Sequence, residues 1–284
     1  MAKNNMKGLA PRALLSPGPA ALNSPKTWLF DVDGTLTPPR GELDPFFRAW
    51  MARFVATREV CLVTGGTWAR IERQCGPALA RAFRAAYLCN GNEARVQGEV
   101  VYSRMLRVPP ALQSALDELM RQPLPLTGQA PVLEHRSGML TLCAVPPSAT
   151  PEQRLAFEQW DAHAHWRLRC AKWLKQACAQ WRFQLAGQTS LDLFEAGADK
   201  SQVLSHEGAG PLWFFADAAY PLGNDWTLAE ALRARNDGSQ VFLVRDWRHT
   251  WGLLQELAQD CAQDCPAHPG GLGSPPPRAL PAAA

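Results

Sequence analysis

Two aspartates separated by one residue are the side chains whose type and spacing most directly suggest chemistry. Asp31 and Asp33 stand in the run Phe-Asp-Val-Asp-Gly-Thr-Leu-Thr, directly after a short apolar segment. A carboxylate can attack phosphorus and form an aspartyl-phosphate. A second carboxylate close by is placed to exchange a proton with the attacking or leaving hydroxyl. The pair therefore predicts a phosphoryl-transfer site in which Asp31 is the nucleophile and Asp33 carries the proton.

Further carboxylates suggest a metal ion at the same place. Asp217 ends another apolar segment, and Asp225 follows one loop later. A buried carboxylate is costly unless a cation compensates it, and Mg²⁺ prefers hard oxygen ligands that it combines with substrate phosphate. We therefore expect a Mg²⁺ site formed by Asp31, Asp33, Asp217 and Asp225. In it, Asp225 lies behind the other carboxylates or binds another cation.

The remaining polar groups of this set have the chemistry to hold a phosphoryl group. Thr64 ends a third apolar segment, and Gly65 and Gly66 follow it. Their hydroxyl and backbone amides are suited to phosphoryl oxygens. Lys200 stands at an expected helix start and can neutralise charge on the phosphoryl group and on Asp31. An Asp-Gly pair alone is also typical of a simple turn, so the prediction rests on the whole set.

Alternating apolar and helical segments must position these residues. The pattern of strand, helix, strand predicts a parallel sheet covered by helices, and ligands bind such sheets beyond the carboxyl ends of the strands. Strands are expected at 27–30, 59–64, 86–89, 212–217 and 240–244, with helices at 45–56, 67–74 and from 225 to about 235.

A different pattern interrupts this sheet. It comprises a hairpin at 94–103, a helix at 110–121, strands at 132–136 and 139–145, a helical stretch at 151–181 broken near 162–166, and two strands flanking 187–189. The fold class is therefore α/β, with an inserted α+β cap. The expected organisation is a flexible extension at 1–26, core at 27–105, cap at 106–197, core at 198–262 and a disordered tail at 263–284.

Composition excludes several classes of partner. The net charge of +3 over 284 residues is too small and scattered to indicate nucleic acid, and no apolar run is long enough to cross a membrane. The eight cysteines match neither a zinc site nor a disulfide scaffold, so we expect reduced thiols and a cytoplasmic protein. Cys261, Cys265 and His268 are either a metal site or, as we expect, a helix end that runs into a tail.

The sequence resembles a known family. The aspartate run resembles the first motif of the haloacid dehalogenase (HAD) superfamily, whose second, third and fourth motifs resemble Thr64, Lys200 and the segment 217–225. Over about residues 27 to 235 the chain is similar to eukaryotic-type phosphomannomutases. Four segments carry this similarity: 30–40, 134–140, 187–194 and 214–225. The resemblance implies an HAD-like Rossmannoid core with a C2-type cap.

The resemblance also implies a reaction and its ligands. A hexose 1,6-bisphosphate activator phosphorylates Asp31, and the phosphoryl group then passes to a hexose monophosphate substrate. Arg40 corresponds to a substrate-binding arginine of the core. The residues that correspond to substrate contacts of the cap are Arg136, Arg154, Ser190 and Asp192. The family can dimerise through its cap, where the tryptophan-rich stretch forms either a dimer surface or cap core; its tryptophans are Trp160, Trp166, Trp173 and Trp181.

Several positions depart from the family pattern. Pro147 stands where the family has a phosphate-binding arginine, Ala218 replaces a lysine, Ala216 replaces a glycine, and Thr64 occupies a usually apolar position. The leading hypothesis is a phosphomannomutase that interconverts mannose 6-phosphate and mannose 1-phosphate, and possible substrates include glucose phosphates. The alternative is an HAD-type sugar-phosphate or bisphosphate phosphatase. The third hypothesis is a binding protein without catalytic activity.

Overall fold

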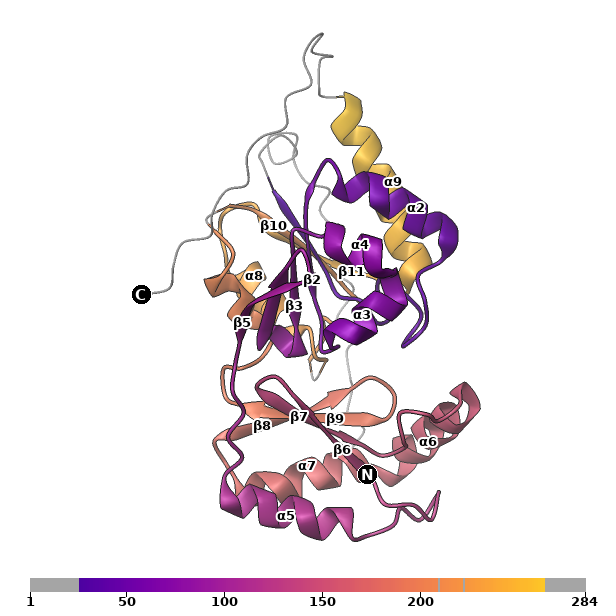
Figure 1. The fold of residues 1–284 in the computed structure, drawn as a ribbon, viewed down its shortest axis with the longest axis vertical. Helices are drawn as coiled ribbons and strands as arrows, with labels where there is room; N and C mark the ends of the chain where they lie inside the picture. Colours follow the sequence, from indigo (N-terminus) through magenta and orange to yellow (C-terminus); the bar gives the residue numbers. More distant parts are fainter. Residues whose placement is uncertain (1–25, 209, 222, 264–284) are drawn as a thin grey trace, which may run out of the picture.

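A seven-stranded sheet and a separate four-stranded sheet organise the molecule. The computed structural model describes residues 26–208, 210–221 and 223–263 (Figure 1). The core elements are β1 (Thr27–Phe30), α2 (Pro45–Val55), β2 (Glu59–Val63), α3 (Trp68–Cys75), α4 (Pro77–Ala82), β3 (Ala85–Leu88), η1 (Cys89–Gly91), β4 (Glu93–Val96), β5 (Glu99–Ser103), η2 (Lys200–Ser205), β10 (Leu212–Ala216), α8 (Trp226–Arg233), β11 (Gln240–Leu243) and α9 (Trp247–Gln263).

The core sheet has the order β11-β10-β1-β2-β3-β4-β5. Its strands are parallel from β11 to β3, and β4 and β5 form an antiparallel hairpin at one edge. Both faces are covered, which explains why the central strands are continuous apolar runs. Phe30 packs on the face of α2, α3, α4 and α9, whereas Leu29 packs on the face of α8 and η2 (Figure 1).

The inserted elements form the cap, whose sheet is antiparallel with the order β6-β7-β9-β8. They are α5 (Pro110–Met120), β6 (Val132–Arg136), β7 (Met139–Cys143), α6 (Pro151–Ala164), α7 (Trp166–Ala177), β8 (Trp181–Ala186) and β9 (Ser190–Glu195). Helices α5 and α7 lie on the side of this sheet away from the core (Figure 1). The predicted α/β fold, with a mostly parallel core sheet and a separate cap sheet, is confirmed.

Alternation along β9 positions the cap side of the site. Leu191 and Leu193 pack into the cluster formed with α5 and α7. Because successive strand residues point to opposite faces, Ser190, Asp192 and Phe194 face the core. Phe194 joins the hydrophobic cluster of the core domain, while Ser190 and Asp192 line a cavity between the two domains. One strand therefore supplies cap core and site residues at alternate positions.

Two local predictions were incomplete. Helix α4 was not expected, and the helical stretch expected to reach Trp181 ends at Ala177. Trp181 begins β8 instead, where apolar residues recur at every second position, as in a half-buried strand. The expected break near 162–166 is confirmed at His165, which has a left-handed φ of 51° between α6 and α7.

The predictions for the tryptophan-rich stretch, the cysteines and the tails can be compared with the structure only in part. Trp181 is buried in the cap core, Trp160 and Trp166 are half-buried against apolar clusters, and Trp173 is 36 % exposed. Six described cysteines are free and buried, namely Cys61, Cys75, Cys89, Cys143, Cys170 and Cys178. Most of both expected tails, including the positions of Cys265 and His268, lies outside the described residues. Among the described helices, none is long and apolar enough to cross a membrane.

Candidate active site

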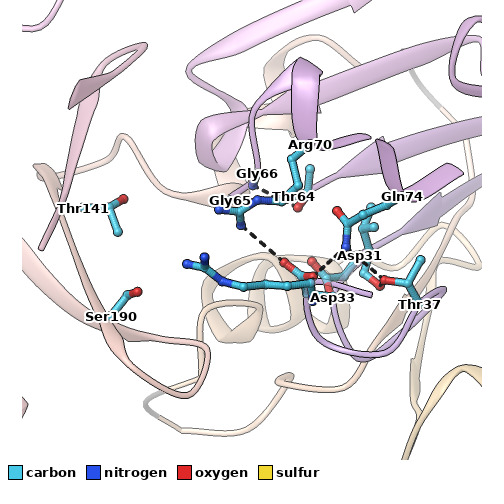
Figure 2. Close-up of polar contacts among 12 residues, drawn as sticks. Asp31, Asp33, Thr37, Thr64, Gly65, Gly66, Arg70, Gln74, Thr141 and Ser190 are labelled. Carbon is cyan, nitrogen blue, oxygen red and sulfur yellow. Dashed lines mark hydrogen bonds and ion pairs between the residues drawn. The ribbon is translucent and has the colours of Figure 1, made fainter. Parts of the chain in front are cut away.

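The carboxyl ends of three parallel strands meet at the cap. Asp31 follows β1, Thr64 follows β2 and Asp217 follows β10, and the three strands are neighbours in the sheet. A cavity of about 590 Å³ lies between this edge and the cap. Figure 2 shows Thr141 and Ser190 on the cap side of this space, facing Asp31 and Asp33 on the core side. The strand ends therefore form one wall of a site that the cap completes.

Lys200 connects two buried carboxylates behind the cavity. Its Nζ donates hydrogen bonds of 2.6 Å to Asp31 Oδ1 and 2.6 Å to Asp225 Oδ1. Burial raises the pKa of Asp31, and Lys200 opposes that rise. Burial alone would lower the pKa of Lys200, but Asp225 and Asp31 outweigh it and keep this pKa above its ordinary value. Lys200 is therefore a charged ammonium group that holds the predicted nucleophile.

Asp31, Asp217 and Asp225 form a site that fits a divalent cation. One carboxylate oxygen of each lies within 4.8 Å of those of the other two. Asp225 Oδ2 is buried and has no hydrogen-bond partner among the described residues. Burial, followed by the charge of Asp225, raises the pKa of Asp217 to about 6. A single lysine leaves this group with excess negative charge, so hard-oxygen coordination of Mg²⁺ suits it.

The carboxylate of Asp33 makes its contacts outside the group formed by Asp31, Asp217 and Asp225. Its Oδ1 accepts hydrogen bonds from the backbone N–H of Arg40 at 2.6 Å and from Gln74 Nε2 at 2.8 Å. Arg70 Nη1 lies 3.5 Å from its Oδ2, and Figure 2 shows the contacts of Asp33 with Gln74 and Arg70. The carboxylate of Asp33 is not part of the acidic group, so the carboxylates placed to hold a metal ion are those of the other three aspartates, and Asp33 as a ligand stays a prediction. Its position beside the cavity suits a proton carrier.

The loop after β2 has a defined hydrogen-bond pattern. Thr64 Oγ1 accepts a hydrogen bond of 3.0 Å from the N–H of Gly66, and the carbonyl of Thr64 accepts one from the N–H of Asn90. The amide of Gly66 is therefore already used within the protein. The hydroxyl hydrogen of Thr64 and the amide of Gly65 are the donors of this loop that remain for phosphoryl oxygens.

The cap contributes one arginine that reaches across to the core. Arg136 donates from Nη1 to the carbonyl of Gly65 at 2.8 Å and from Nη2 to Glu134 at 2.5 Å. Asp192 accepts from Thr141 at 2.8 Å, its cross-strand neighbour. Burial raises the pKa of Asp192, and Arg136 opposes that rise. In this part of the cap wall, the positive charge of Arg136 therefore lies near the carboxyl groups of Glu134 and Asp192.

Arg154 is buried in the cap and already makes several contacts with the protein. Its Nη2 donates to the carbonyl of Pro147 at 2.8 Å, and its Nη1 lies 3.4 Å from Thr189 Oγ1. Pro147, which stands where the resemblance expects a further arginine, thus supplies a backbone acceptor for Arg154. Every residue predicted for substrate binding lines the same cavity: Arg40, Gly65, Gly66, Arg136, Arg154, Ser190 and Asp192.

The structure also reveals lining residues that the sequence analysis missed. They are Arg70, Thr141, Glu158 and Arg167, with Gln74 just behind Asp33. One signal was available for Arg70. Helix α3 begins immediately after the Gly65–Gly66 turn, so its first turn must lie at the same edge of the sheet. Arg167 carries no comparable signal, because only the tertiary fold brings it to the turn at Gly187.

Comparisons with known proteins agree with this architecture. A family model for eukaryotic phosphomannomutase matches residues 48–241. Phosphomannomutases of Glycine max and Arabidopsis thaliana are each 28 % identical to this chain, over 215 and 213 residues. The first alignment covers 72 % of this chain and 87 % of the relative, and the second covers 72 % and 86 %.

Solved structures show the same fold at lower sequence identity. The C-terminal domain of trehalose-6-phosphate phosphatase from C. albicans superposes with a TM-score of 0.56 at 14 % identity, covering 86 % of this chain and 96 % of that one. A sugar phosphatase of HAD subclass IIB gives a TM-score of 0.55 at 12 % identity, covering 82 % and 99 %. These likenesses show an HAD subclass IIB fold.

Proposed function

This chain belongs to the eukaryotic phosphomannomutase family, and from that membership we propose that it interconverts mannose 6-phosphate and mannose 1-phosphate. The observation that supports this proposal most directly is the two-walled cavity. One wall carries a lysine-held carboxylate, Asp31, and the other carries arginines and hydroxyl groups suited to a phosphorylated sugar. Glucose phosphates, which present the same groups, are further candidate substrates.

The core residues have complementary roles in the proposed reaction. Asp31 attacks the phosphorus of a hexose 1,6-bisphosphate, a P–O bond to the sugar breaks, and an aspartyl-phosphate forms. Asp33 gives a proton to the leaving sugar oxygen and takes one from the sugar hydroxyl that attacks in the return step. Lys200 and Thr64 stabilise negative charge on the transferring group. Mg²⁺ held by Asp31, Asp217 and Asp225 supplies further charge neutralisation there.

The cap residues have the chemistry to bind the rest of the substrate. Arginine forks suit the phosphate that is not transferred, and Arg136 and Arg154 supply such forks. Ser190 and Asp192 are suited to hydroxyl groups of the sugar ring. Because the cap covers the cavity, it also limits access of water to the phosphorylated Asp31.

A coupled assay tests this proposal. With mannose 1-phosphate, a hexose 1,6-bisphosphate and Mg²⁺, we expect formation of mannose 6-phosphate. The Asp31→Asn variant should lose this activity by a factor of about 10³ or more, because the amide is a poor nucleophile. Release of inorganic phosphate without any isomerised sugar would refute the mutase. Activity that survives in Asp31→Asn would refute catalysis at this residue, whereas binding of hexose phosphates without any turnover by the natural chain would support the non-catalytic binding protein.

One observation favours a phosphatase as the second candidate. Pro147 removes an expected cationic contact, and its carbonyl accepts a hydrogen bond from Arg154. Loss of one charge-assisted contact weakens phosphate binding by about 1.5–3 kcal/mol, which matters for a mutase that must retain a bisphosphate. Phosphate release from a sugar monophosphate in the absence of an acceptor sugar supports this candidate.

Location and assembly are also proposals. We propose a cytoplasmic enzyme, because the six described cysteines are free and free thiols are typical of reducing compartments. We further propose a homodimer formed through the cap, where Leu155, Leu168 and Trp173 are exposed on α6 and α7. Sedimentation of the purified protein tests the dimer.

A further inference from the structure

The loop that follows the parallel strand β3 has a left-handed backbone at three successive residues. The φ angles are 51° at Cys89, 60° at Asn90 and 86° at Gly91. This conformation is costly for residues other than glycine, and it persists where the surrounding structure enforces it, often at functional sites. Asparagine adopts it more readily than most residues. The side chain that this loop orients is therefore that of Asn90.

The loop is fixed to the core beside the residues expected to hold the phosphoryl group. The N–H of Asn90 donates to the carbonyl of Thr64 at 2.9 Å, and the N–H of Cys89 donates to the carbonyl of Gly66 at 3.0 Å. The carbonyl of Asn90 accepts a hydrogen bond of 2.8 Å from Gln202 Nε2 of η2. The backbone of Asn90 therefore has a fixed position relative to the loop after β2.

The side chain of Asn90 points to the cap and contacts Asp192 of β9. Asn90 Nδ2 donates to Asp192 Oδ2 at 3.4 Å and to Met139 Sδ at 3.8 Å. Asn90 and Asp192 are 1 % and 2 % exposed, and Asn90 Oδ1 has no hydrogen-bond partner among the described residues. A Cβ built on Gly65 would lie 3.2 Å from Asn90 Oδ1 and 3.5 Å from Asp192 Oδ2. The two side chains therefore meet at Gly65, which the cap contacts through Arg136.

Asp192 is the member of this pair that faces the cavity. The described residues that line the cavity include Asp192 but not Asn90. Thr141 donates to Asp192 Oδ1 at 2.8 Å, so each carboxylate oxygen has one protein donor. A carboxylate offers about four acceptor sites, and the remaining ones can accept hydrogen bonds from hydroxyl groups in the cavity. One donor from the cap and one from the core therefore set the direction of these acceptor sites.

We propose that Asn90 is a positioning residue, which orients Asp192 from the core to accept hydrogen bonds from hydroxyl groups of a hexose phosphate. Asn90 is hydrogen-bonded both to the loop after β2 and to Asp192, so it links the residues that face the phosphoryl group with a carboxylate that faces the sugar. The inference rests on the proposed function, because it requires a phosphorylated sugar. It applies equally to a mutase and to a phosphatase.

Substrate binding measures this role separately from turnover. The Asp31→Asn background stops turnover, and calorimetry in Mg²⁺ then gives the Kd of mannose 1-phosphate. Asn90→Gly keeps the left-handed backbone but removes the amide, and it should raise this Kd about 5- to 30-fold, within the range of coupling between residues in contact. Gln97→Gly is the matched control, because Gln97 has a similar φ of 53° in the exposed turn between β4 and β5. The control should change the Kd by less than about twofold.

Two further variants distinguish orientation of Asp192 from a structural role. In an Asp192→Ala background, Asn90→Gly should change the Kd by less than about twofold, because the contact that it removes is already absent. Asn90→Asp keeps the size and the left-handed preference but replaces the donor with a second carboxylate, so the Kd should rise at least as much as in Asn90→Gly.

Several outcomes would overturn the inference. They are an unchanged Kd in Asn90→Gly, an equal loss with and without Asp192, tight binding in Asn90→Asp, and no binding of mannose 1-phosphate in the Asp31→Asn background. A lower thermal midpoint with an unchanged Kd would show that Asn90 is structural only. A chain that binds mannose 1-phosphate through Asn90 but forms no mannose 6-phosphate would refute the mutase alone.

Discussion

Gly34 shows how one backbone position makes room for the acidic group of Asp31, Asp217 and Asp225. Its φ is +84°, and a Cβ placed there would lie 2.2 Å from Asp217 Oδ2. The residue after Asp33 must therefore be glycine for two reasons. It adopts a left-handed conformation, and it leaves space for the carboxylate of a neighbouring strand.

Gly34→Ala should accordingly destabilise the protein and disturb the acidic group. Gly197→Ala is the matched control, because Gly197 has a similar φ of +87° but no atom within 4 Å of the new Cβ. The control should lower the free energy of unfolding by about 1–2 kcal/mol through backbone strain alone. Gly34→Ala should add about 1–3 kcal/mol of overpacking and weaken Mg²⁺ binding. Equal effects in urea titrations would contradict the proposed contact.

The pKa of Asp217 predicts a pH dependence for the proposed binding of Mg²⁺. Burial raises this pKa from 3.8 to about 6, so the folded protein retains a proton that the unfolded chain has lost between these values. In the metal-free protein the contribution of Asp217 to stability therefore decreases as the pH rises from 3.8 to 6. Because Mg²⁺ displaces that proton, its affinity should fall about tenfold per pH unit below pH 6.

Calorimetry at several pH values between 5 and 7.5 measures this effect. Proton release on Mg²⁺ binding should be larger at pH 5.5 than at pH 7.5. Asp192→Asn is a suitable control, since Asp192 is also buried but lies outside the acidic group. That variant should keep the same profile. A pH-independent Mg²⁺ affinity would mean that Asp217 is not a ligand.

The sequence predicted the residues at the ends of core strands and missed those whose role depends on tertiary placement. Asp31, Thr64 and Asp217 could be found because each follows an apolar run, and parallel strands end at one edge. Arg70 could not be distinguished from solvated helix charges by its type. Only the direction of α3, which begins at that edge, brings its guanidinium group into the cavity.

At the scale of elements, the junction of α6 and α7 supports the turn that lines the cavity. Asp161 accepts a hydrogen bond of 2.7 Å from Arg167 Nε, and Arg167 Nη1 donates 2.9 Å to the carbonyl of Gly187. Both side chains of the ion pair are buried. This pair therefore connects the helices of the cap with the turn between β8 and β9.

Breaking this pair should be costly. Asp161→Ala leaves a buried arginine without its partner and should reduce the free energy of unfolding by about 3–5 kcal/mol. The matched control is Glu230→Ala, which breaks an exposed pair with Arg233 and should cost less than about 1 kcal/mol. Chemical denaturation measures both. A loss in Asp161→Ala as small as in the control would show that the pair does not stabilise the cap.

Whether an element could be predicted depended on how clearly its apolar residues recur along the sequence. The strand β9 was predicted after 187–189, and the leucines that alternate with Ser190, Asp192 and Phe194 explain its two faces. The end of α7 was misplaced because Trp181 continues the tryptophan spacing of the helix, although it begins the strand pattern of β8. Helix α4 is six residues long, which is too short for helical periodicity to stand out.

At the scale of the whole molecule, an apolar seam joins the cap to the core. Met139 and Phe194 belong to the cap sheet but are buried in the hydrophobic cluster of the core domain. The hydrogen bond of Gln184 Nε2 with the carbonyl of Gly223 adds a polar contact at 2.9 Å. The sequence predicted the insertion of the cap, but not this contact, since periodicity describes each sheet separately.

The seam should make the two domains unfold together. We expect one calorimetric transition for the natural chain and two for Phe194→Ala, in which loss of the buried ring costs about 3–5 kcal/mol. Phe47→Ala removes an equally buried phenylalanine of α2 whose ring stacks on Trp247 and Trp251 of α9, within the core domain. It should destabilise the protein while keeping one transition. Two transitions in the natural chain would contradict this coupling.

The order of the elements along the chain has a consequence for protein synthesis. Asp31 emerges from the ribosome early, whereas Lys200, Asp217 and Asp225 follow the whole cap, and β1 meets β10 only after residue 212 has been made. A nascent or prematurely terminated chain therefore carries Asp31 without the lysine that holds it and without the other two carboxylates of the acidic group. By the time these partners are translated, the cap that covers them has already been made, so no stage of synthesis produces the candidate site without the segment that shields it.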